Sequence, residues 1–211
     1  CVLALIHYIQ AENVAQTLEM LDVYCKELEN ASFDKIILDA TDENGNNLLI
    51  VALKNSTREV ALALMKKQPE LASKNKMFED MYFGVDSETK NTTLHYAIEA
   101  GYDEIIQLIM ASALKIKTKE SAGYEFWLRE NAEGYIPLHK ATLLNQVSYV
   151  PYLLDAHSNV DEMFAHVNSF TRQGNTPLHL ACEGGHYQFA AMLISYGAQT
   201  HFRNFNDKTP L

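Results

Sequence analysis

Residues 174–186 read Gly-Asn-Thr-Pro-Leu-His-Leu-Ala-Cys-Glu-Gly-Gly-His, and this stretch decides the fold because the chain repeats it. Altered copies lie at 134–141, 90–101 and 45–52, and a further copy begins at 206–211. The leucine of the motif recurs at intervals of 45, 44, 40 and 33 residues, at Leu49, Leu94, Leu138, Leu178 and Leu211. Self-similarity at such a period is typical of arrays of small stacked units.

The residue types of the motif predict a short helix with defined ends. Thr176 is suited to cap the helix, and Pro177 is suited to its first position, where no backbone N–H is needed. Leu178 and Ala181 fall on one helical face and are expected to pack inward. Gly185 is expected to end the helix, because glycine adopts a left-handed backbone without strain. The following residues, about 186 to 194, predict a second helix, so each unit is helix, turn, helix and loop.

The repeated G-x-T-P-L-H-x-A-x-x-x-G motif resembles that of the ankyrin-repeat family. The resemblance implies an all-α solenoid of helix-turn-helix units joined by long loops. We expect residues 1–40 to form N-terminal helices that are a worn or capping repeat. The repeats proper are expected over 41–211, at about 41–75, 86–114, 131–157 and 172–201, with a truncated unit from 204.

Several copies depart from the motif at named positions. A faint copy at the N-terminus places Ile6, His7 and Asn13 where the leucine, histidine and second glycine are expected. In the clearer copies, other residues stand at glycine positions: Lys90 and Asp207 at the first, Ser56 and Asn145 at the second. Such residues are tolerable in turns, so these substitutions do not argue against the fold.

Three units exceed 33 residues, by 12, 11 and 7, and the extra residues follow the second helix of each unit. The insertions are rich in aromatic residues and Met, so we expect them to be ordered on the side of the interrepeat loops. Trp127, the only Trp, is either a partner contact or a side chain that packs over the array. We favour packing, as we do for Met77 to Phe83, because large exposed apolar patches are uncommon.

Composition excludes several classes of function. A net charge of −10 argues against a nucleic-acid partner, because phosphates are bound by Lys and Arg. The three Cys form no C-x-x-C pair, so a disulfide framework is not expected and a reducing compartment is favoured. No apolar run has the length of a membrane span. We therefore expect an intracellular, cytoplasmic protein, or one in the host cytoplasm if it is a bacterial effector.

The sequence gives little evidence for a metal-binding or catalytic site. The histidine column, His7, His95, His139 and His179, invites a metal hypothesis, but adjacent helices about 8–10 Å apart cannot bring these rings to one ion. We expect each ring to bond loop backbone instead. Cys25 and Cys182 lack the partners of a nucleophile, and no phosphate-binding or hydrolase motif is present. We therefore expect no catalytic residue, no metal and no cofactor.

The resemblance implies a protein–protein interaction module that contacts its partner through hairpin tips and the exposed ends of the inner helices. Tyr135, Leu143 and Leu144 lead the candidates, because they are apolar where a solvated residue is expected. The full set is Glu88, Thr89, Asn91, Trp127, Glu133, Tyr135, Leu143, Leu144, Arg172, Gln173, Asn175 and Glu183. The expected partner is a protein with a basic or mixed surface, and neither nucleic acid nor membrane insertion is expected.

Two alternatives remain open. The chain begins without Met and ends inside a motif, so we expect it to be cut from a longer structure. It could then be the substrate-recruiting or regulatory region of a larger multidomain enzyme, and its composition resembles that of effectors of intracellular bacteria. It could also be the cytosolic array of a membrane protein.

Overall fold

The computed structural model describes residues 2–27, 40–66, 82–115, 126–157 and 159–211. Two compact units divide the chain, unit 1 at residues 1–124 and unit 2 at 125–211, and each is described by itself. Within the described ranges the regular elements are helices, with two isolated β-bridges, Thr41–Asn47 and Val85–Thr92, at the bases of loops. The predicted all-α class is confirmed.

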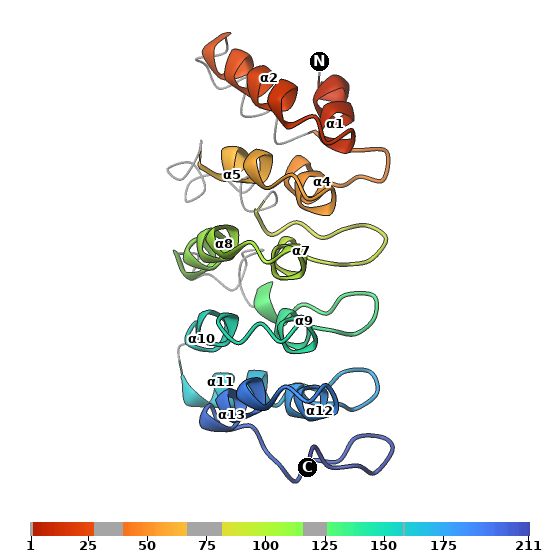
Figure 1. Ribbon diagram of the computed structural model, residues 1–211, viewed down its shortest axis with the longest axis vertical. Coiled ribbons are helices and arrows are strands. Elements are labelled where there is room, and N and C mark those ends of the chain that lie inside the picture. Colours follow the sequence, from red (N-terminus) through yellow and green to blue (C-terminus); the bar gives the residue numbers. More distant parts are fainter. Residues whose placement is uncertain (1, 28–39, 67–81, 116–125, 158) are drawn as a thin grey trace. The chain divides into compact units, whose positions relative to one another are not determined.

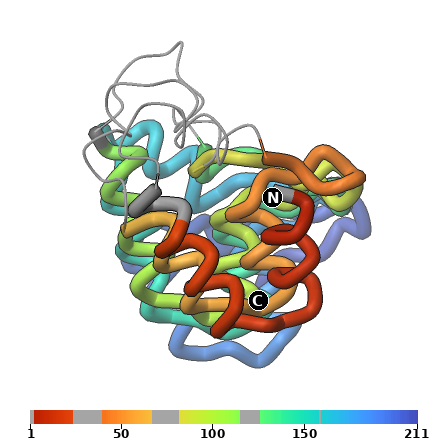
Figure 2. The backbone as a smooth tube through the Cα atoms, turned by 90° about the horizontal axis from the view of Figure 1, so that it is seen from above, coloured from red at the N-terminus to blue at the C-terminus, as the bar shows by residue number. Residues whose placement is uncertain are grey.

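The described residues of unit 1 form three helix pairs stacked on one another (Figure 1). They are α1 (Val2–Gln10) with α2 (Val14–Glu27), α4 (Leu48–Lys54) with α5 (Arg58–Lys66), and α7 (Thr93–Ala100) with α8 (Asp103–Lys115). The first helix of each pair contacts the first helix of the next, and the second helices contact likewise. Figure 2 looks down this stack, where α1 and α2 lie over the later pairs and the loops of unit 1 project to one side.

Unit 2 contains two such pairs and two additional elements. The pairs are α9 (Pro137–Leu143) with α10 (Tyr149–Leu154), and α12 (Pro177–Glu183) with α13 (Tyr187–Ser195). The helices α9 and α12 contact each other as the inner row. A short 3-10 helix, η1 (Phe126–Leu128), contacts α9, and a further helix, α11 (Val160–Val167), contacts α10.

The core of each unit is built from the motif residues. The motif leucines and alanines have no exposed surface at Leu49, Ala52, Leu94, Ala97, Leu138, Ala141, Leu178 and Ala181. Each leucine and the alanine three residues later lie on one face of the helix, which packs against the neighbouring pair. No pair buries its apolar face alone, so the stack is the source of stability.

The helix starts confirm the predicted role of Thr176. Its hydroxyl accepts the backbone N–H of His179, and the ring Nδ1 of His179 accepts the N–H of Thr176 in return. Thr92 and His95 form the same reciprocal cap on α7. Ile136 has no side-chain acceptor, yet Nδ1 of His139 still accepts its backbone N–H. The histidine therefore completes one half of the cap even where the threonine is missing.

The turns explain why the departures from glycine are tolerated. Gly185 follows α12 with φ of 68°, and Asn145 and Ser56 take the same place with φ of 54° and 55°. Lys90 and Asp207 stand for the first glycine with φ of 57° and 59°. All are left-handed, so the turn geometry is kept at the cost of some backbone strain.

The prediction for the faint N-terminal copy was wrong by one residue. The left-handed residue there is Glu12, with φ of 55°, and not Asn13. In the other copies the left-handed residue comes seven positions after the motif leucine, which assigns Leu5 to that role; Leu5 is fully buried. His7 is exposed and does not belong to the histidine column.

The described residues of the first two inserted segments pack against the array. The hydroxyl of Tyr82 donates to the carbonyl of Met65, and burial raises the pKa of Tyr82 to about 12. Phe83 is also buried, as is Trp127 of η1. The packing interpretation is confirmed for Phe83 and Trp127. Met77, Phe78, Met81, Tyr124 and the side chain of Cys25 lie outside the described residues.

Candidate partner-binding surface

In the described part of the chain, five hairpin loops project from the helix pairs, and a side chain organises each loop from inside. Its oxygen accepts the backbone N–H groups two and four positions later; in the second loop, which is one residue longer, it accepts those two and three positions later. These residues are Asp42, Asp86, Asn131, Thr171 and Asn204. This position was not predicted from the sequence. The available signal was an Asp, Asn or Thr three or four residues before the left-handed residue of each of these five loops.

Asp86 is fully buried, and a buried carboxylate is destabilising unless neighbouring groups stabilise its charge. Burial alone would raise its pKa, but hydrogen bonds from Thr89 and Lys54 favour the charged form and hold the pKa at about 2. The ammonium of Lys54 lies 3.0 Å from the carboxylate. Lys54 comes from the end of α4, so the ion pair fastens this loop to the preceding helix pair.

Two histidines of the column, His139 and His179, connect successive repeats of unit 2 by hydrogen bonds. Nδ1 of His179 accepts a backbone N–H, so the ring proton lies on Nε2 and is donated to the carbonyl of Lys208, 3.0 Å away. His139 donates in the same way to the carbonyl of Ser169 at 3.2 Å. For these two residues the predicted bond to loop backbone is confirmed. Each ring ties a helix to the next loop of unit 2.

Two predicted contact residues take part in links between neighbouring loops. The amide of Asn204 donates to Oδ1 of Asn175 at 2.7 Å, and the N–H of Phe205 donates to the carbonyl of Gln173. In unit 1 the N–H of Ser87 donates to Oδ1 of Asn46, which occupies the position that corresponds to Asn175. Side chains at this loop position therefore form hydrogen bonds to the next loop of the same unit.

The predicted contact residues differ in how far solvent reaches them. Leu143 and Leu144, at the end of α9, are 41% and 44% exposed. Tyr135 is half-buried and lies edge-on to the ring of His139, with centroids 6.1 Å apart. Half-buried positions also include Thr89 and Asn175. Exposed positions are Glu88, Glu133, Arg172, Gln173 and Glu183.

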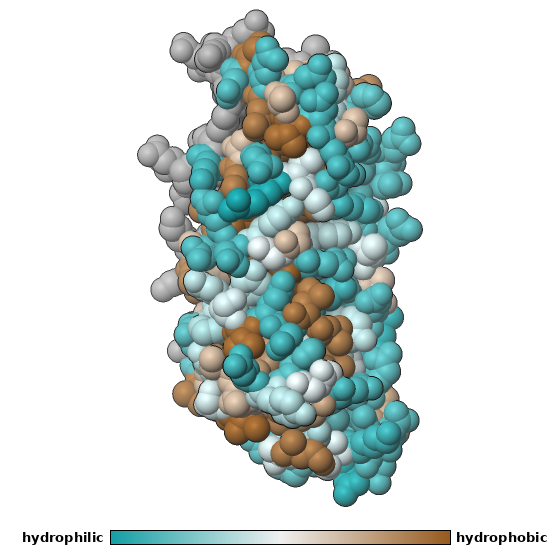
Figure 3. Space-filling view, in the orientation of Figure 1, coloured by the Kyte–Doolittle hydropathy of each residue, from teal (hydrophilic) through white to brown (hydrophobic). Residues whose placement is uncertain are grey.

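Two of the predicted contact residues are largely inaccessible. Asn91 is 7% exposed and Trp127 is 9% exposed. A partner could not reach either side chain without rearrangement, so the remaining residues form the candidate surface. Figure 3 shows hydrophobic side chains gathered over part of the helical face of unit 2, whereas the edge that carries the loops is mostly hydrophilic.

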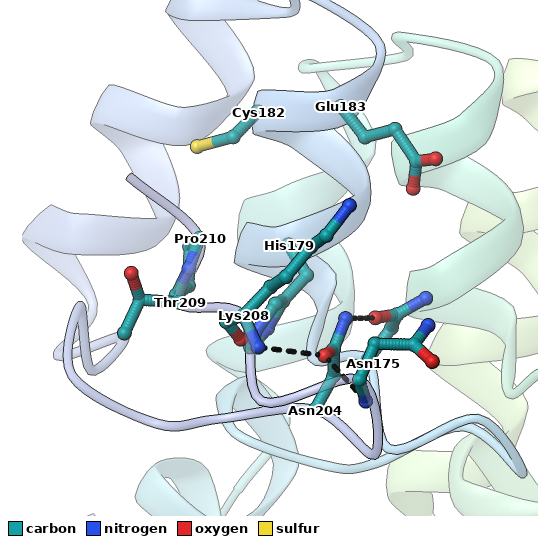
Figure 4. A pocket seen from close by; sticks show the side chains of 9 residues that line it. Asn175, His179, Cys182, Glu183, Asn204, Lys208, Thr209 and Pro210 are labelled. Atoms are coloured by element: carbon teal, nitrogen blue, oxygen red, sulfur yellow. Dashed lines mark hydrogen bonds between the residues drawn. The ribbon is translucent and has the colours of Figure 1, made fainter.

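A pocket of about 280 Å³ lies beside α12 and the last loop of unit 2. Figure 4 shows Asn204 bonded to both Asn175 and Lys208 at its base. Both ring nitrogens of His179 are already occupied, and burial raises the pKa of the Cys182 thiol. His179 therefore offers no free ring nitrogen to this pocket, and Cys182 is not an activated thiol.

No group of three or more His, Cys, Asp or Glu side chains in the described part of the chain is arranged to hold a metal ion. Among the described helices, none has the length and apolar character that a membrane crossing requires.

Comparison with known proteins supports the same architecture. The family model for ankyrin repeats, in three copies, matches residues 117–204. The NF-kappa-B p105 subunit of Gallus gallus is 24% identical over 219 residues, which cover 78% of this chain and 22% of that protein. A putative ankyrin repeat protein of Acanthamoeba polyphaga mimivirus is 25% identical, over 78% of this chain and 23% of its own length. The chain thus spans about a quarter of these relatives.

A probable E3 ubiquitin-protein ligase of Oryza sativa is 25% identical over 77% of this chain and 40% of its own length. Among solved structures, an ankyrin repeat domain from Acinetobacter baumannii superimposes with a TM-score of 0.65 at 19% identity, covering 98% of this chain and 87% of that one. The structural likeness concerns the fold, and the sequence matches concern the repeats. Together with the buried motif residues and the reciprocal caps, they identify ankyrin repeats within residues 117–204 and an ankyrin-type fold for the chain.

Proposed function

We propose that this chain binds a protein partner, and that the end of α9 and the adjoining loops of unit 2 form the contact surface. Ankyrin repeats are in general protein–protein interaction modules. The observation that carries the proposal is the pair Leu143 and Leu144, which are consecutive, apolar and each more than two-fifths exposed. We call them, with Tyr135, the Leu143 surface.

The polar residues around this surface suit an interface rim. Exposed Glu133, Arg172, Gln173 and Glu183 belong to the same unit. A partner that covers the leucines gains by removing apolar area from water, while rim residues contribute less and help to exclude solvent. In unit 1, Glu88 and Thr89 occupy corresponding loop positions and are proposed as additional contacts.

The charge of the chain favours a particular kind of partner. A net charge of −10 produces a negative field that attracts a basic or mixed surface and repels an acidic one. Charge of this kind mainly raises the rate of association, whereas the buried apolar contacts slow dissociation. We further propose an intracellular location and no catalytic role for these residues.

The test uses the chain as bait in cell extract, followed by titration of the purified partner. The combined Leu143→Ala and Leu144→Ala variant should weaken binding about tenfold or more, since truncating a central contact costs about 1–2 kcal/mol or more. Alanine keeps the helical propensity of the site, so circular dichroism should be unchanged. Val160→Ala is the control, because Val160 is an apolar residue of the same unit and is 72% exposed.

Equal affinity of the double variant and the wild type, with folding intact, would place the surface elsewhere. A second function, recruitment of a substrate for a larger enzyme, is favoured by the similarity to the rice ubiquitin ligase. It uses the same surface but predicts that the bound partner becomes chemically modified in cells. Mass spectrometry of the partner, with and without the double substitution in the chain, distinguishes the two functions.

A further inference from the structure

The helix α11 is held to unit 2 by few groups. Of its eight residues, only His166 and Val167 are buried. Val160, Asp161, Glu162, Phe164 and Ala165 face solvent. Asn168, just after the helix, accepts the N–H of Gln199 and donates to the carbonyl of Gly197. A helix with so small a buried face has a low free energy of local opening, and one of its two buried side chains can be protonated.

The buried histidine is paired with a second one. Nε2 of His157, in the segment after α10, lies 2.7 Å from Nδ1 of His166, and the ring centroids are 4.9 Å apart. Trp127 of η1 stands edge-on to His157 with centroids 5.8 Å apart. His166 is 1% exposed, and its Nε2 has no hydrogen-bond partner among the described residues. This His157–His166 pair thus shares one hydrogen bond, with one proton between the two nitrogens.

The charged and titratable groups around the pair act in opposite directions. Burial lowers the pKa of His157, and Glu162, whose carboxylate lies 4.0 Å from Nδ1 of His157, only partly opposes it. Burial also lowers the pKa of His166 well below its usual value, and the neighbouring His157 and His139 lower it further. Both rings are therefore neutral in the folded protein near pH 7.

We propose that the His157–His166 pair is an acid-sensitive latch, which holds α11 against α10 at neutral pH and releases it on mild acidification. This inference does not depend on the proposed partner surface. The latch would make the outer side of unit 2 responsive to an acidic compartment or a fall in cytoplasmic pH.

The direction of the effect follows from proton linkage. When α11 opens, both rings reach water and regain the ordinary pKa of about 6.5. Because the closed state binds protons more weakly, closure is fully favoured above about pH 6.5 and loses free energy as the pH falls below it. One added proton on Nδ1 of His157, beside Glu162, leaves the shared hydrogen bond intact. A second added proton, on Nδ1 of His166, would break that bond and place two positive rings in contact. The open state, which exposes α11 and little else, takes up the proton at lower cost.

The experiment follows amide hydrogen exchange of the wild-type chain at pH 7.5 and 5.0, corrected for the intrinsic effect of pH. Protection of residues 160–167 should fall at least tenfold relative to α12, which serves as the internal reference. Emission from Trp127 should change in the same pH range, because Trp127 is the only Trp and touches His157. An unchanged ratio between α11 and α12, with constant emission, would rule out the latch.

Variants separate the latch from a general effect of acid. An Asn amide can replace Nδ1 and a Gln amide can replace Nε2, so the His166→Asn and His157→Gln double variant should keep a hydrogen bond and lose the pH dependence. His7→Gln is the control, because His7 is exposed in unit 1, and it should behave as wild type. A double variant that is as pH-sensitive as the wild type would exclude the pair as the cause.

If the double variant does not fold, ring-proton NMR of the wild type decides. Titration of His157 and His166 below the ordinary range, together with the loss of α11 protection, supports the latch. Titration in the ordinary range while α11 stays protected overturns it.

Discussion

Single residues of the motif make more than one structural interaction. The ring of His179 closes the cap of its own helix through Nδ1 and bonds the carbonyl of Lys208 through Nε2. Thr176 sets the first residue of α12 and satisfies a backbone N–H that the helix leaves free. The residues of the motif thus form hydrogen bonds both within their own helix cap and to the next repeat, and these bonds form together when one repeat packs on the next.

The cap predicts a measurable loss of stability. Thr176→Ala removes the acceptor of the His179 N–H and should lower the free energy of unfolding of unit 2 by about 1 kcal/mol, while Thr176→Ser should restore most of it. Urea unfolding followed by Trp127 emission reports on this unit. Thr200→Ala, at an exposed position, is the matched control. Equal losses in the two alanine variants would refute the role of the cap.

The buried carboxylate of Asp86 predicts sensitivity to strong acid. Its pKa is about 2 in the folded state, below the ordinary 3.8, so its stabilising effect is complete above about pH 4 and is lost as the pH falls toward 2. The loss should reach about 2 kcal/mol. Lys54→Met removes one source of the low pKa, so acid unfolding of unit 1 should begin at a higher pH. Circular dichroism at a series of pH values measures this, with Lys208→Met as control; coincident curves would contradict it.

At the scale of elements, the turns decide how far one helix pair differs from another. The left-handed residue after each inner helix allows the chain to reverse and start the outer helix. Glycine fills this place after α7 and α12, whereas Ser56 and Asn145 fill it elsewhere with φ near 55°. The backbone conformation is therefore kept, while the side chain at the turn varies between units.

Substitution at Gly185 should reveal the cost of this conformation alone. No atom lies within 4 Å of the place where a side chain would begin, so crowding contributes nothing. Gly185→Ala should destabilise unit 2 by about 1 kcal/mol, because φ of 68° is strained for alanine. Gly185→Asn should cost clearly less, because asparagine tolerates this region and Asn145 already occupies the corresponding place. Thermal unfolding compares the two, and equal losses would argue against backbone strain.

At the scale of the whole molecule, charge and surface chemistry bear on the proposed function. The loops present polar side chains around the exposed leucines of unit 2, and the chain carries ten more acidic than basic residues. Solvent screens such a field over about 8–10 Å at physiological salt. Electrostatics therefore acts on the approach of a partner more than on the final contact.

Association kinetics should separate these two contributions. Raising the salt from about 50 to 500 mM should slow association with a basic partner several-fold and change its dissociation much less. The Leu143→Ala and Leu144→Ala variant should do the reverse, with faster dissociation and the same salt dependence. Surface-plasmon measurements of both rate constants give the result. A salt-independent association rate would show that the partner is not recognised through its charge.

The sequence by itself determined the repeat, its helical content and the inward direction of the motif leucines and alanines. These are local properties, because caps, turns and a 3.6-residue period depend on residues a few positions apart. The same locality explains the error at the N-terminus, where Ile6 and Leu5 are both apolar and only the backbone at Glu12 distinguishes them.

Tertiary structure alone decided which polar residues are available to a partner. Asn91 and Trp127 are buried, and the amide of Asn175 links two loops, because other segments of the same unit cover positions that look exposed in a single repeat. The His157–His166 pair likewise forms only when an inserted helix folds back onto α10. Burial and pairing of this kind depend on contacts between segments distant in sequence, and those contacts leave no pattern in the spacing of residues.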